Sequence, residues 1–159
     1  MSATTAPTTR STHYLAPSTG ERRFGRAVIR ITRLGLSMRG SRELILPGRR
    51  TGEPRSTAVN LLELDGRSYL VSPRGETEWV RNLRANEARG ELRLGRKVRA
   101  FDAQELADAD KVPVLRAYLE RWAMEVGRFF DGVGADSTDE ELAAIAGRHP
   151  VFALEISRR

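Results

Sequence analysis

Short turns separate most of the strand-like segments in this 159-residue chain. The apolar pattern predicts strands at residues 43–46, 56–64, 67–72, 90–94, 97–103 and 151–156. Two of the connections, Asp65-Gly66 and Gly95-Arg96, are only two residues long. Because such turns join strands that run antiparallel, the sheet is expected to be antiparallel. Closure into a barrel removes unpaired edges, so the sequence favours a small antiparallel barrel of about six strands.

Helical spacing of apolar residues predicts helices at residues 21–39, 76–86, 108–128 and 139–146. Strands and helices do not alternate along the chain, which argues against a doubly wound α/β fold. The fold class is therefore α+β and mainly β, with the barrel flanked by helices. Residues 1–20 are rich in Ser, Thr, Ala and Pro and are predicted to be a disordered tail, so residues 21–159 form a single domain.

Composition excludes several kinds of site. The chain has no cysteine, and its two histidines, His13 and His149, lie far apart, so no metal site is expected. No apolar run approaches the length of a membrane span and no secretory segment is evident, so we expect a cytoplasmic protein. The net charge is +6, and 25 of the 27 basic residues are arginine. Such a chain favours anionic ligands: nucleic acid, an anionic membrane surface or a polyanionic cofactor.

The segment 48–55 reads Gly-Arg-Arg-Thr-Gly-Glu-Pro-Arg and lies between two predicted strands. Glycine lets backbone amides approach a ligand closely, and the arginine fork binds phosphate or carboxylate at two points. One interpretation is an anion-binding loop. The other is an ordinary solvated hairpin turn, because the same residue types favour turns.

Two more motifs follow: Ser72-Pro73-Arg74-Gly75 at a strand end, and residues 79–86 on the next predicted helix. We expect the two basic turns to face one pocket. The ring of Trp79 would then line an aromatic cofactor, and Asn82 would hydrogen-bond to it. The alternative for Trp79 is plain core packing, which is commoner for this residue type.

The order of these motifs resembles the deazaflavin-dependent nitroreductases. In that family a Gly-Arg-Lys-Ser-Gly-x-x-Arg loop precedes Ser-Lys-Gly-Gly and a Trp-Tyr-x-Asn-Leu-x-Ala-Asn-Pro helix. The resemblance spans about residues 44–103, and the basic segment 21–39 supports it more weakly. This chain differs by Arg50 in place of lysine, by Val80 in place of an aromatic residue and by a shorter loop between residues 72 and 79.

The resemblance implies a split β-barrel and coenzyme F420, a deazaflavin whose tail carries a phosphate and several glutamates. By the same resemblance, the cofactor-binding residues would be Arg49, Arg50, Thr51, Gly52, Arg55, Ser72, Arg74, Gly75, Trp79 and Asn82. The activity would be hydride transfer to a small organic acceptor such as a quinone, an enone or a nitro compound. No catalytic acid is evident. Tyr69 and Tyr118 are candidate proton donors, and Trp122 with Phe129 or Phe130 is a candidate lining for an apolar substrate mouth. Core packing along the predicted helix 108–128 is the more ordinary role for such side chains.

Three other interpretations stay open. A split-barrel protein that uses FMN would also need an arginine loop, for a single phosphate. A basic nucleic-acid-binding module fits the charge, but aromatic residues are few and no recognition motif appears, so nucleic acid is not an expected partner. The segment 21–39 has an apolar stripe and an arginine face, which fits either a helix that covers the core or one that contacts a membrane surface.

Overall fold

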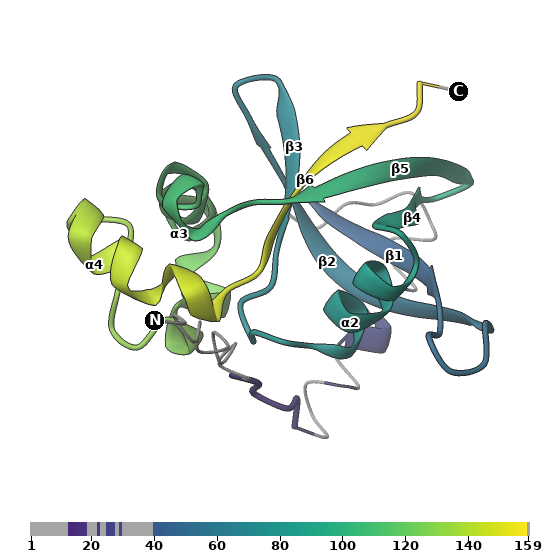
Figure 1. Ribbon diagram of the computed structural model, residues 1–159, viewed down its shortest axis with the longest axis horizontal. Helices are drawn as coiled ribbons and strands as arrows, with labels where there is room; N and C mark the ends of the chain where they lie inside the picture. Colours follow the sequence, from purple (N-terminus) through teal and green to yellow (C-terminus); the bar gives the residue numbers. More distant parts are fainter. Residues whose placement is uncertain (1–12, 19–21, 23–24, 28, 30–39, 159) are drawn as a thin grey trace, which may run out of the picture.

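A closed antiparallel barrel forms the centre of the protein (Figure 1). The computed structural model describes residues 13–18, 22, 25–27, 29 and 40–158. Within that part, six strands close in the order β1-β2-β3-β6-β5-β4. Their bounds are β1 Ser41–Pro47, β2 Pro54–Leu64, β3 Arg67–Val71, β4 Arg89–Leu94, β5 Lys97–Glu105 and β6 Val151–Ile156. The predicted small antiparallel barrel of six strands is confirmed.

The turn between β2 and β3 sets the register of that hairpin. Asp65 and Gly66 both have positive φ, at 51° and 76°, as the two central residues of the tight turn preferred by twisted hairpins require. The pairing continues from Leu64 opposite Arg67 to Leu61 opposite Leu70. The residues of the turn therefore favour the same antiparallel hairpin that the strand pairing shows.

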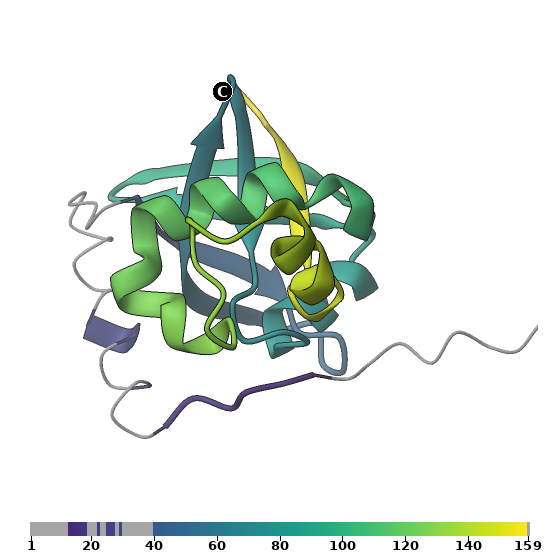
Figure 2. The same cartoon turned by 90° about the vertical axis from the view of Figure 1, so that its left-hand side faces the viewer.

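Helices cover one side of the barrel and one of its ends. Their bounds are α2 Glu78–Ala85, α3 Val112–Val126 and α4 Asp139–Ile145, with short 3-10 turns at Asp108–Asp110, Gly127–Phe129 and Ala146–Arg148. Figure 2 shows α3 and α4 together on one side of the barrel. The predicted helix 108–128 is shorter, because a separate 3-10 turn precedes α3 and Pro113 lies in the first turn of α3.

Two hydrophobic cores share the strands. Leu61 and Leu70 belong to the cluster inside the barrel, whereas their neighbours Leu62 and Tyr69 belong to a second cluster with α3 and α4. Successive side chains of a strand point to opposite faces, so these strands are buried on both sides. Trp122 is buried in the second cluster, which confirms the core-packing interpretation for that side chain.

Parts of the N-terminal region lie outside the described residues. Of the predicted helix 21–39, residues 22, 25–27 and 29 are helical, and the rest is not described. In the predicted tail, Tyr14 forms an isolated antiparallel bridge with Gly75. No described helix has the length and apolar content needed to cross a bilayer.

Candidate functional site

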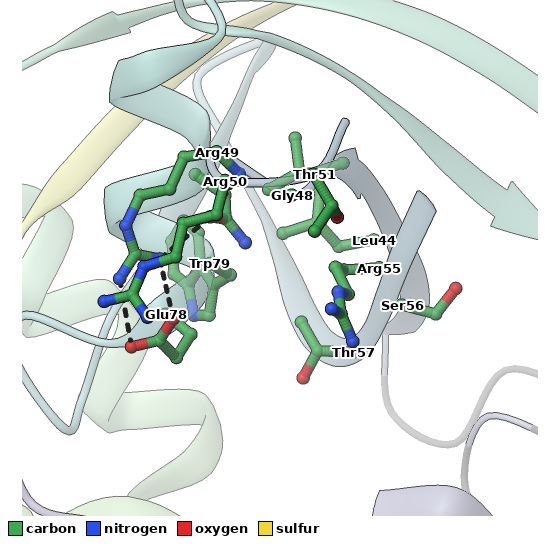
Figure 3. Close-up of a pocket in the computed structure, with 12 residues that line it drawn as sticks. Leu44, Gly48, Arg49, Arg50, Thr51, Arg55, Ser56, Thr57, Glu78 and Trp79 are labelled. Carbon is green, nitrogen blue, oxygen red and sulfur yellow. Dashed lines mark hydrogen bonds and ion pairs between the residues drawn. The ribbon is translucent and has the colours of Figure 1, made fainter. Parts of the chain in front are cut away.

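A pocket of about 530 Å³ lies between the β1–β2 hairpin and α2 (Figure 3). Its lining residues are Leu44, Leu46, Gly48, Arg49, Arg50, Thr51, Arg55, Ser56, Thr57, Glu78, Trp79 and Asn82. Six of the predicted cofactor-binding residues are among them: Arg49, Arg50, Thr51, Arg55, Trp79 and Asn82. The fold therefore brings together the segment 48–55, called the arginine loop below, and the motif at residues 79–86 on α2.

Strand register places an apolar floor beside the basic rim. Leu46 pairs with Arg55 and Leu44 pairs with Thr57, so each leucine lies directly across from a polar residue on the same face of the hairpin. Both leucines are buried in the barrel cluster. The pocket thus offers an apolar surface to one part of a ligand and charged or hydroxyl groups to another.

The arginine loop is a closed hairpin tip. The Gly48 N–H donates to the Glu53 carbonyl at 2.8 Å, and the Gly52 N–H donates to the Gly48 carbonyl at 2.8 Å. A Cβ on Gly48 would lie only 3.3 Å from that Glu53 carbonyl oxygen. The segment is thus both a well-formed hairpin turn and a wall of the pocket, so the two interpretations of its sequence do not exclude each other.

Arg49 ties the loop to α2. Its backbone N–H and its Nη1 both donate to Asn82 Oδ1, at 3.2 and 3.0 Å, and Nη1 also lies 2.6 Å from Glu78 Oε2. Hydrogen bonding to Arg49 lowers the pKa of Glu78, so this carboxyl is ionised at neutral pH. Asn82 is buried, so its contacts hold the loop and the helix in a defined relative position.

Arg50 and Arg55 differ from Arg49 in their charge partners. Within the described part of the chain, neither guanidinium has a carboxylate within ion-pair distance. The backbone N–H groups of Arg50 and Thr51 likewise bond to no acceptor among the described residues. Thr51 Oγ1 accepts a bond from the Glu53 N–H at 3.3 Å, which leaves its hydroxyl hydrogen to donate. These groups together form a set of donors suited to an anion.

Trp79 forms one wall of the pocket from α2. Its ring is partly buried and packs against Phe152 with the ring centroids 5.8 Å apart. The side chain therefore takes part in the core and also lines the pocket. Packing on Phe152 restrains the ring, so the face that borders the pocket has a defined orientation.

The second basic turn lies elsewhere. The Ser72 hydroxyl is buried and donates to the Gly75 carbonyl at 2.6 Å, while Arg74 Nη1 donates to the Leu15 carbonyl at 3.2 Å. The guanidinium of Arg74 also lies over the ring of Phe129, 4.2 Å from its centroid. None of these contacts involves the pocket-lining residues. The structure does not bring the two basic turns to one pocket as expected.

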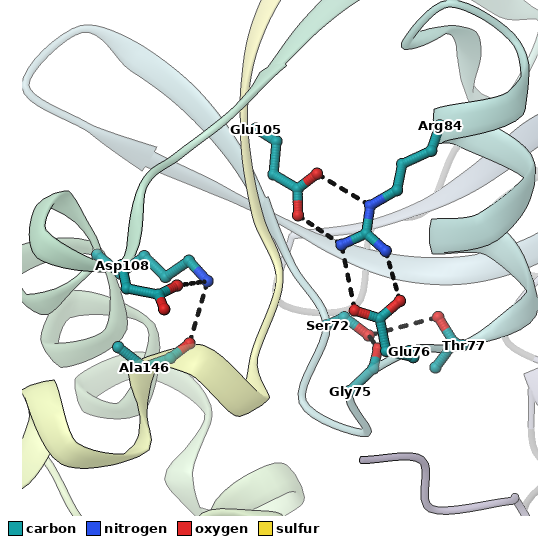
Figure 4. Close-up of polar contacts among 9 residues, drawn as sticks. Ser72, Gly75, Glu76, Thr77, Arg84, Glu105, Asp108 and Ala146 are labelled. Atoms are coloured by element: carbon teal, nitrogen blue, oxygen red, sulfur yellow. Dashed lines mark hydrogen bonds and ion pairs between the residues drawn. The ribbon is translucent and has the colours of Figure 1, made fainter. Parts of the chain in front are cut away.

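Arg84 of α2 binds two carboxylates, those of Glu105 and Glu76 (Figure 4). Arg84 donates to Glu105 through Nε at 2.9 Å and through Nη2 at 2.5 Å, and it also pairs with Glu76. Hydrogen bonds to both carboxylates raise the pKa of Arg84, so its charge is permanent. These contacts connect α2 to β5 and to the segment that precedes the helix.

Sequence reasoning missed the acidic member of the pocket. Glu78 directly precedes Trp79 and lies four residues before Asn82, so helical spacing placed it on the same side of α2. The candidate proton donors Tyr69 and Tyr118 belong to the cluster under α3 and α4 instead of the pocket. Burial raises the pKa of the Tyr118 hydroxyl, which opposes its ionisation.

Comparison with known proteins identifies the family. Residues 26–129 match the family model described as F420H(2)-dependent quinone reductase. This chain belongs to that family. It is therefore an F420-dependent oxidoreductase, and the predicted resemblance to deazaflavin-dependent enzymes is confirmed. A search of curated proteins gave no match.

Solved structures support the fold. One, described as a domain-swapped dimer, is 19% identical with a TM-score of 0.52, and the match covers 79% of this chain and 92% of that one. An F420-H2 dependent reductase is 20% identical with a TM-score of 0.50, covering 76% of this chain and 100% of that one. A protein of unknown function from Agrobacterium tumefaciens is 17% identical with a TM-score of 0.50, covering 83% and 56%.

Proposed function

We propose that this pocket binds coenzyme F420 and that the electron acceptor is a quinone-type compound. The observation that carries the proposal is the pair of pocket-lining guanidiniums, Arg50 and Arg55, that have no carboxylate partner among the described residues. The phosphate and glutamates of the F420 tail supply anionic partners for these two guanidiniums. The family description names the quinone.

Each wall of the pocket has its own role in this proposal. Arg50, Arg55 and Thr51 hold the anionic tail, helped by the backbone N–H groups of Arg50 and Thr51, which bond to no acceptor among the described residues. Trp79 borders the aromatic part of the cofactor, and Asn82 keeps the loop attached to α2 while its side-chain N–H groups remain for a ligand. The remaining predicted residues act outside the pocket: Gly52 closes the loop, and Ser72, Arg74 and Gly75 shape the turn that leads into α2.

In its bound, reduced form, F420 supplies a hydride, which carries two electrons. Reduction of a quinone to a hydroquinone also consumes one proton. Glu78 is the single carboxyl group among the described residues that line the pocket, and its lowered pKa keeps it ionised. The proton is therefore taken from solvent in this proposal. The chain's own contribution is to bind, to orient and, through the leucine floor, to exclude water from one side.

A cofactor titration tests the proposal. Wild-type protein is titrated with F420 and with FMN, and binding is followed by thermal stabilisation and by cofactor fluorescence. F420 should bind more tightly than FMN. Arg55→Ala should weaken F420 binding roughly tenfold or more, because a charge-assisted hydrogen bond is lost.

Arg74→Ala is the matched control. It removes the same charge from the second basic turn, whose contacts lie with Leu15 and Phe129, so F420 affinity should stay within about twofold of wild type. Equal losses in both variants would contradict the assignment of the arginine loop as the tail-binding wall. Tighter binding of FMN than of F420 would contradict the choice of cofactor.

The place of action is a further part of the proposal. We infer that the protein works in the cytoplasm and that its basic segment 21–39 contacts the membrane surface, where lipid-soluble quinones reside. Co-sedimentation with anionic and with neutral liposomes, using the full chain and a variant that lacks residues 1–39, tests this idea. Equal recovery of both proteins in the pellet would contradict it.

A further inference from the structure

Glu78 places a negative charge inside a pocket that is otherwise basic. Its Oε2 lies 2.6 Å from Arg49 Nη1, and its Oε1 accepts from Arg49 Nη2 at 3.4 Å and lies 3.7 Å from Arg81 Nη1. The two carboxylate oxygens thus occupy both arms of the Arg49 fork (Figure 3). A carboxylate or phosphate group of a ligand would bind the same fork in the same way.

Arg49 does not need Glu78 to stay in position. Asn82 Oδ1 accepts from the backbone N–H of Arg49 at 3.2 Å and from Nη1 at 3.0 Å, and Asn82 is only 6% exposed. These bonds remain when the carboxylate leaves. Asn82 therefore positions Arg49, whereas Glu78 neutralises its charge.

Glu78 is also free to move away. Its side chain is 64% exposed, and the side chain of Arg81, one turn further along α2, offers a second cationic partner. An exposed ion pair of this kind contributes little to stability, so replacing it by a ligand anion has a small cost. The charge of Arg50 also acts on this carboxyl and helps to lower its pKa.

We propose that Glu78 is an internal competitor for the anion site: it binds the fork of Arg49 until an anionic group of the ligand displaces it. This inference rests on the proposed function, because it assigns the displacing group to the anionic tail of F420. Glu78 thereby lowers the affinity of the pocket for anions in general. Ligands with several negative charges overcome the competition better than ligands with one.

The Glu78→Gln variant tests the competition. Its F420 affinity should be roughly three- to tenfold higher than that of wild type, since an ionised competitor is lost and a neutral amide of the same shape remains. Isothermal titration calorimetry measures the dissociation constant directly, without turnover. The gain should shrink at high salt, because screening weakens the exposed ion pair.

Two controls separate local from general effects. Glu87→Gln removes the same charge from a side chain that is 81% exposed, pairs with Arg89 and does not line the pocket, so F420 affinity should change less than about twofold. A deazaflavin without phosphate or glutamates should bind wild type and Glu78→Gln equally. Pyrophosphate, followed by thermal stabilisation, probes the anion site alone and should bind Glu78→Gln more tightly.

The outcomes distinguish the two proposals. If wild type binds F420 and Glu78→Gln binds it equally or more weakly, the competition is refuted and the proposed cofactor site stands. If wild type does not bind F420, the proposed function is refuted, and pyrophosphate decides the competition by itself. A similar gain in F420 affinity in Glu87→Gln would show that net charge alone causes the effect, and it would refute the role of Glu78.

Discussion

His149 makes the stability of the fold depend on pH. Its ring is buried, stacks on Phe130 with centroids 4.1 Å apart and places Nδ1 3.3 Å from the Ser72 carbonyl. Burial lowers the pKa of His149 to about 4, outweighing the hydrogen bond to Ser72, and electrostatic interactions with His13 and Lys111 act in the same direction as burial. The folded protein therefore holds this ring in its neutral form.

The size of the effect follows from the two pKa values. In the unfolded chain His149 titrates near its ordinary value of 6.5, whereas in the fold it titrates at about 4. Between these values the unfolded state binds more protons, so stability is fully present above pH 6.5 and is lost as the pH falls towards 4. Integration from pH 7 to pH 4.5 gives a loss of about 2 kcal/mol from this one group.

Urea unfolding at pH 7 and pH 4.5 measures that loss, with His149→Asn as the reference. Asparagine can donate a hydrogen bond towards Ser72 and does not titrate in this range, so carboxylates and other groups contribute equally to both proteins. The pH-dependent drop in unfolding free energy should be about 2 kcal/mol larger in wild type than in the variant. The same drop in both proteins, or an NMR titration of His149 near 6.5, would refute the reasoning.

Two further predictions concern the turns around the pocket. Gly75→Ala should release the segment 13–15 and accelerate its proteolysis, because the new Cβ would lie 1.9 Å from the His13 carbonyl oxygen. Gly75 has a φ of +83°, so Gly132→Ala, with a φ of +80° and no atom within 4 Å of the new Cβ, controls for backbone strain alone. Equal proteolysis of both variants would contradict the steric cause. Asn82→Ala should lower both the melting temperature and the F420 affinity. Asn82→Asp should keep the melting temperature but weaken F420 binding, because it adds a negative charge. If Asn82→Ala melts like wild type, this amide does not hold the loop.

Local signals in the sequence were sufficient for much of the fold. The two-residue turn Asp65-Gly66 forms because its backbone conformation suits those residues, independently of distant contacts. The order of motifs between residues 44 and 103 was also enough to identify the family. Helix ends were less well predicted, as in the separate 3-10 turn before α3, because capping and burial decide them together.

The membership of the pocket depended on tertiary structure. Arg49 and Asn82 are 33 positions apart, and only closure of the barrel brings the β1–β2 hairpin against α2. Arg74 carries the same charge in a similar turn, yet its guanidinium contacts Leu15 and Phe129. Its turn follows β3, which pairs with β6, and therefore lies beside the segment 13–15. Residue type alone indicated that arginines in turns would bind an anionic group. Which arginine faces the pocket was decided by strand order, because the barrel fixes where each turn emerges.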